Sequence, residues 1–112
     1  MLADHFDVDS MDMLREVMEE EFSDLLTVYI DDSAQRLPKL RSALQAGASE
    51  ELRELAHSFK GASGNISAYA LAALCFEMEK AAKADELDGL DVLLGRIEQE
   101  FNVVQSLLRE MI

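Results

Sequence analysis

The chain has 112 residues, 49% of them hydrophobic, and a formal net charge of −13 at pH 7. This size and apolar content predict a single domain, residues 1–112, with a core that needs no disulfides, and the lone Cys75 indicates a reducing compartment, which we expect to be the cytoplasm. The negative net charge argues against nucleic acid and anionic membrane as partners. Residues Met1–His5 show no secretory signal pattern. No apolar run approaches the roughly 20 residues that span a bilayer.

The N-terminal part of the chain predicts a loose end followed by a short helix. Residues 1–8 are mixed in character and are expected to fray, which would leave His5 exposed and without a role. Asp9 or Ser10 can cap a first helix that reaches about Glu19.

A long second helix is predicted for residues 21–46, because apolar side chains from Phe22 to Leu44 recur at helical spacing. Pro38 removes a backbone donor within this stretch. The apolar stripe resumes in phase after the proline, so we predict one kinked helix and not two.

Three further helices complete the predicted fold. The third begins at a Ser49 cap and runs to about Asn65, and Ser67 can cap a fourth that reaches about Ala84. A fifth begins near Asp88 and carries an uninterrupted apolar stripe. No strand pattern occurs, so the four long amphipathic helices predict an all-α, antiparallel four-helix bundle, with the short first helix covering one end.

The third helix carries an unusual second stripe beside its apolar face. His57, Lys60, Gly61 and Gly64 share this stripe at helical spacing. Glycine inside a helix costs about 1 kcal/mol relative to alanine, and core packing gains nothing from it on this face. Because a bare backbone allows another molecule to approach closely, the pattern favours an accessible imidazole with a cation beside it. Such an imidazole suits a nucleophile that accepts and passes on a phosphoryl group.

The run His57-x-x-Lys60-Gly61-Ala62-Ser63 resembles the signature of histidine-containing phosphotransfer (HPt) domains of phosphorelays. The likeness continues through the small residues 68–73 and the run 75–79, and by length and helix pattern it covers nearly the whole chain. One departure is Ser67, which stands where family members often have a glycine.

The resemblance implies a carrier and not an enzyme. His57 would be the phosphoryl acceptor, and Lys60 would contact the phosphoryl oxygens. Gly61 and Gly64 would leave room for the partner, and Glu79, on the following helix, can orient the imidazole. The implied partners are the receiver domain of a hybrid sensor kinase and that of a response regulator, which supply the metal ion and the catalytic aspartate. We expect a monomer that uses no cofactor. We also expect that it binds no ATP, because the chain has no glycine-rich loop of the kind that binds nucleotide phosphates.

Two features are candidates for partner docking. Arg53, one turn before His57, can attract an acidic receiver site, or it can pair with Glu50 or Glu54 on its own helix. An apolar stripe near the N-terminus can form an exposed docking patch, although such stripes are more often core. It consists of Met11, Leu14, Met18 and Phe22.

Two other functions are weaker. Glu54 and His57 match the Glu-x-x-His spacing of di-iron bundles, but the further ligands that such a site needs are missing, so we expect no metal site. The alternative to a phosphotransfer protein is a helical adaptor that binds a receiver or kinase without transfer. Cys75 lies on the apolar stripe of the fourth helix and is expected to be a core residue.

Overall fold

The computed structural model describes all 112 residues. Its helices are α1 (Val8–Met18), α2 (Phe22–Gln45), α3 (Ser49–Asn65), α4 (Tyr69–Lys83) and α5 (Leu90–Met111), with short 3-10 segments at Leu2–Asp4 and Glu19–Glu21.

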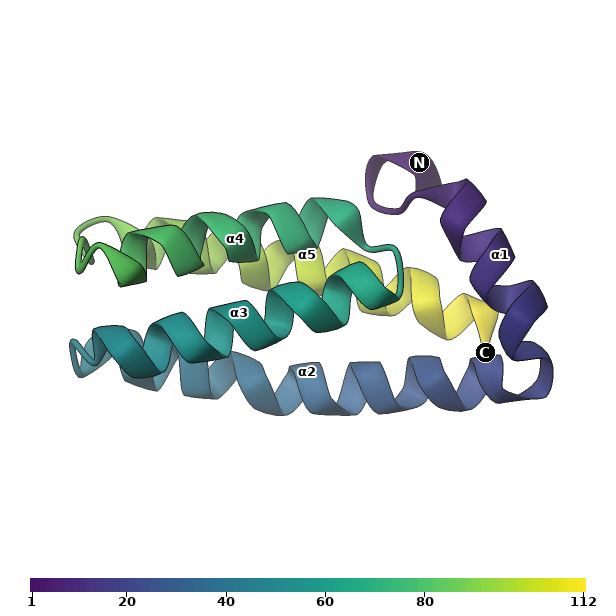
Figure 1. Cartoon of the computed structure of the whole chain (residues 1–112), viewed down its shortest axis with the longest axis horizontal. Coiled ribbons are helices and arrows are strands. Elements are labelled where there is room, and N and C mark those ends of the chain that lie inside the picture. The colour runs from purple at the N-terminus through teal and green to yellow at the C-terminus, as the bar shows by residue number, and fades with distance from the viewer.

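Helices α2 to α5 run alternately up and down a bundle that measures 42 × 22 × 19 Å (Figure 1). α3 packs against α2 and α4, and α5 packs against the same two helices from the other side. α1 crosses one end of the bundle, next to the C-terminus of the chain. The predicted all-α four-helix bundle with a short N-terminal helix is therefore confirmed. None of the helices combines the length and hydropathy that crossing a membrane would require.

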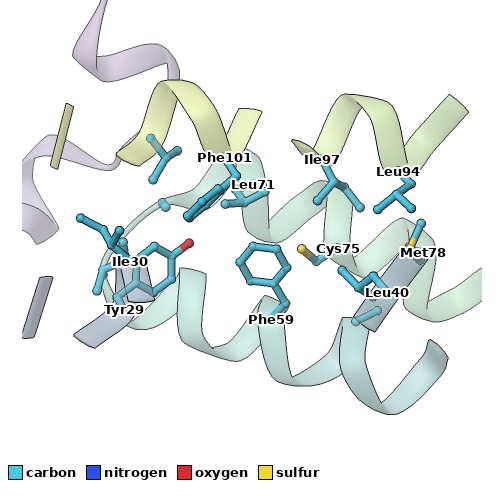
Figure 2. Close-up of a cluster of buried hydrophobic side chains, with 14 of the residues drawn as sticks. Tyr29, Ile30, Leu40, Phe59, Leu71, Cys75, Met78, Leu94, Ile97 and Phe101 are labelled. Carbon is cyan, nitrogen blue, oxygen red and sulfur yellow. The ribbon is translucent and has the colours of Figure 1, made fainter. Parts of the chain in front are cut away.

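Aromatic side chains occupy the centre of the core. Phe59 of α3 meets Phe101 of α5 edge to face, with ring centroids 6.1 Å apart, and Tyr29 of α2 lies 6.3 Å from Phe101 (Figure 2). The Tyr29 hydroxyl shares a hydrogen bond of 2.8 Å with Ser63 Oγ, so this buried polar group is paired. Cys75 is fully buried, as predicted, and burial raises the pKa of its thiol to about 12.

The N-terminal segment does not fray, contrary to the prediction. Phe6 is buried in the core, and His5 Nδ1 lies 2.7 Å from Glu100 Oε2 on α5. The Tyr69 hydroxyl donates a hydrogen bond to the carbonyl of Ala3. An isolated sequence stretch gives no sign of these contacts, because each partner lies far along the chain.

Several helix ends differ in detail from the prediction. α1 is capped by Asp7, whose carboxylate accepts a hydrogen bond from the Ser10 amide, and not by Asp9 or Ser10. α2 continues as one helix through Pro38, as predicted. The α3 and α4 caps predicted at Ser49 and Ser67 are absent, since both helices begin after an alanine whose side chain makes no cap.

Ser67 instead closes the end of α3 with a left-handed backbone, at φ +65°. Its amide donates to the carbonyl of Gly64, and the Ala68 amide donates to the carbonyl of Ser63, which is the Schellman arrangement. Gly47 ends α2 in the same way, at φ +66°. The serine thus adopts the conformation for which glycine is the usual residue.

Candidate functional site

The imidazole of His57 lies midway along α3, and 62% of its side chain is exposed. Gly61 and Gly64 follow it on the same face of the helix. A Cβ atom added at either glycine would meet nothing within 4 Å, and neither backbone needs a positive φ. Nothing inside the fold therefore requires glycine at these two positions, and their effect is to leave the surface beside His57 bare.

Glu79 of α4 contacts both His57 and Lys60. Its Oε2 lies 2.8 Å from Nδ1 of His57, and its Oε1 lies 2.8 Å from the ammonium of Lys60. Glu79 can reach both because α3 and α4 pack side by side, and because His57 and Lys60 are one helical turn apart. Only 16% of the Glu79 side chain is exposed, so the carboxylate is held between the helices.

The charge on Glu79 decides which nitrogen of the imidazole is free. The hydrogen bond from Lys60, and then that from His57, lower the pKa of Glu79, so the group is an anion at neutral pH. A carboxylate only accepts hydrogen bonds, so the neutral ring of His57 carries its proton on Nδ1. Nε2 then carries no proton, and its lone pair is available for reaction on the exposed imidazole.

Arg53 is engaged on its own helix. Its guanidinium makes two hydrogen bonds to the carboxylate of Glu50, at 2.5 and 3.2 Å, and lies 4.0 Å from Glu54. This geometry favours pairing within the helix over the alternative role in attracting a receiver.

The predicted apolar docking patch is wrong for two of its four residues. Met11 of α1 and Phe22, the first residue of α2, belong to the buried core, because α1 lies across that end of the bundle (Figure 1). Leu14 and Met18 are half-buried and pack against that core. The stripe was visible in the sequence, but its periodicity could not show whether it faced solvent or another helix.

An apolar surface does lie along the groove between α2 and α3, where Ala62 follows Gly61 in the chain. Val28 is 57% exposed, and it lines, with Leu25 and Ala62, a hollow of about 160 Å³. Leu25 and Val28 also line a second hollow, which reaches Met18. We call the three residues Leu25, Val28 and Ala62 the α2–α3 groove.

Sequence reasoning also missed Phe76 of α4 as part of the site. Its ring is 45% exposed, and the ammonium groups of Lys60 and Lys80 lie 5.0 and 4.8 Å from its centroid. One available signal was its position off the apolar stripe of α4, three residues before Glu79. The structure has no group of three or more His, Cys, Asp or Glu side chains that could hold a metal ion.

Comparison with known proteins identifies the class to which this fold and site belong. The family model of the Hpt domain matches residues 24–110. The chain therefore belongs to the Hpt family of phosphorelay domains, as its motif predicted.

Two solved structures illustrate the likeness. The chain is similar to histidine-containing phosphotransfer protein B (HptB) from Pseudomonas aeruginosa PAO1, with 42% sequence identity and a TM-score of 0.93 over 96% of this chain and 93% of that one. It shares its fold with histidine-containing phosphotransfer protein ZmHP2 from maize, at 18% identity and a TM-score of 0.78 over 92% of this chain and 83% of that one. The comparison with curated proteins gives no significant match.

Proposed function

We propose that this protein accepts a phosphoryl group on Nε2 of His57 from the receiver domain of a hybrid sensor kinase and passes it to the receiver domain of a response regulator. The observation that carries this proposal is the exposed imidazole whose Nδ1 is bound to Glu79. Membership of the Hpt family and the 42% identity to a histidine-containing phosphotransfer protein support the same reaction.

The chemistry follows from the tautomer of His57. The Nε2 lone pair attacks the phosphorus of the receiver's aspartyl phosphate, a P–N bond forms, and the P–O bond to the aspartate breaks as its carboxylate leaves. The ring gains positive charge in this step, and the anionic Glu79 on Nδ1 stabilises that charge. Lys60 supplies a positive charge one turn away for the phosphoryl oxygens. The reverse reaction delivers the group to the second receiver.

The partners would dock over α3, because the reacting phosphorus must come within bonding distance of an atom on that helix. Gly61 and Gly64 allow the partner's active site to approach His57, and the α2–α3 groove offers the partner an apolar surface on the α2 side of the same helix. We propose that the protein acts as a cytoplasmic monomer and that residues 1–112 form a single domain. It is a carrier in this scheme, since the receiver supplies the metal ion and the aspartate.

The test uses receiver domains from the same genome, each carrying radioactive aspartyl phosphate, mixed in turn with the protein. At least one should transfer acid-labile, base-stable label to the wild type and none to His57→Gln. Absence of label with every receiver, despite binding, would support an adaptor without transfer. Label that persists in His57→Gln would exclude His57 as the acceptor.

A matched pair of valines tests the docking surface in the same assay. Val28→Glu places a charge in the α2–α3 groove, whereas Val92→Glu makes the same change at an exposed valine on α5, 67% exposed and across the bundle. We expect Val28→Glu to raise the receiver concentration needed for half-maximal transfer by about tenfold, and Val92→Glu to leave it unchanged. Equal effects of the two variants would place docking elsewhere.

A further inference from the structure

Phe76 is a large aromatic side chain, 45% exposed, whose ring lies against Lys60 of the site. The ammonium groups of Lys60 and Lys80 both lie over its ring, within the roughly 6 Å range of cation–π attraction. Phe76, Glu79 and Lys80 follow one another at i, i+3 and i+4, so α4 presents them on one face. Nearly half of Phe76 remains exposed, and the ring lies against the ammonium groups of two lysines, one of which is Lys60 of the site.

Lys60 links this ring to the imidazole. Its ammonium contacts the Glu79 carboxylate and the face of Phe76 at the same time, and the other oxygen of Glu79 holds His57. Contacts thus run without interruption from Phe76 through Lys60 and Glu79 to His57. A lysine side chain has four rotatable bonds, and a single ion pair at a surface restrains it poorly. The aromatic ring supplies the second contact that limits where the ammonium can go.

The restraint on the Lys60 ammonium matters because the protein as a whole is strongly acidic. The protein carries a net charge of −13, yet two lysine ammonium groups lie on the Phe76 ring, and one of them, that of Lys60, shares the Glu79 carboxylate with His57. A freely moving Lys60 would spend part of its time away from the imidazole and would leave the charge of Glu79 unbalanced.

We propose that Phe76 is a positioning residue for phosphotransfer, whose ring holds the Lys60 ammonium against Glu79 and so fixes the charge arrangement around His57. This inference rests on the proposed function, because it concerns the geometry of the same site. Phe76 acts through Lys60 and Glu79, and it takes no part in bond making or breaking.

The test compares Phe76→Leu with Phe76→Tyr, which keeps an aromatic face. Loss of the ring should slow transfer at saturating receiver by about two- to fivefold, the size expected from an exposed cation–π contact, with the receiver concentration for half-maximal transfer unchanged. Phe76→Tyr should restore the wild-type rate. Val103→Ala, at another exposed apolar position on α5, should change neither quantity.

A second readout needs no transfer reaction. The carboxyl carbon of Glu79, followed by NMR as pH is varied, should titrate at a higher pH in Phe76→Leu than in the wild type, because Lys60 is the largest cause of the lowered pKa of Glu79. An unchanged titration of Glu79, or an effect confined to the half-saturating receiver concentration, would overturn the positioning role. If the wild type accepts no label while Glu79 still responds to Phe76→Leu, the proposed function fails and the positional coupling stands.

Discussion

Glycines in α3 and α5 allow a measurement of how much folding stability the protein loses by keeping the surface beside His57 bare. Gly61 lies one turn after His57, and Gly95 lies in the second turn of α5, on the other side of the bundle. Both have ordinary helical backbones, and a Cβ atom at either would meet nothing within 4 Å. Replacing either glycine with glutamine should therefore stabilise the fold by about 0.5–1 kcal/mol, through helix propensity alone. For a domain of this size that corresponds to about 4 °C in melting temperature.

The two substitutions should differ in transfer. Gly61→Gln places a long side chain where the partner must approach, and a displacement of about 1 Å in a reacting complex can cost up to about 100-fold in rate. We expect Gly61→Gln to slow transfer by at least about tenfold and Gly95→Gln to leave it unchanged.

Thermal unfolding and transfer from a labelled receiver, measured on the same preparations, check both expectations. Equal transfer by both variants would refute the idea that bare backbone beside His57 serves partner access. Strong destabilisation by Gly61→Gln alone would mean that the glycine has a structural role that its open surroundings do not reveal.

The remaining predictions concern stability. Ser67→Gly should stabilise the protein by about 0.5–1 kcal/mol in urea unfolding, because a left-handed backbone costs an L residue about 1–2 kcal/mol and glycine loses part of that advantage to chain entropy. Gly47→Ser, at the equivalent position of α2, should destabilise the protein by a similar amount. A destabilising Ser67→Gly or a stabilising Gly47→Ser would contradict this account of the turn. Glu79→Gln should be less stable than the wild type at pH 7, since a lowered carboxyl pKa stabilises the folded state above the ordinary value of 4.5. That difference should disappear as the pH falls from 4.5 through the lowered value, and parallel pH profiles of the two proteins would show that the Lys60 contact adds nothing.

Much of the candidate site could be predicted because its geometry is local. His57, Lys60, Gly61 and Gly64 lie within two turns of one helix, so the helical period alone places them on one face. Glu79 lies on another helix, and only the family resemblance indicated it; the structure brings its carboxylate to the imidazole. The position of Phe76 off the apolar stripe of α4 was visible in the sequence, but no pattern indicated that its ring would contact the Lys60 ammonium across the α3–α4 interface.

The sequence by itself determined the helices, their amphipathic faces and the choice of His57 as the proposed acceptor, because these depend on spacing along the chain. The tertiary structure decided what lies opposite each face. It buried Met11 of α1 and Phe22 of α2 where α1 lies across the end of the bundle, and it placed Phe6 of the N-terminal segment in the core. The physical reason is that periodicity shows which side chains share a surface, whereas burial depends on whether a distant element packs against that surface.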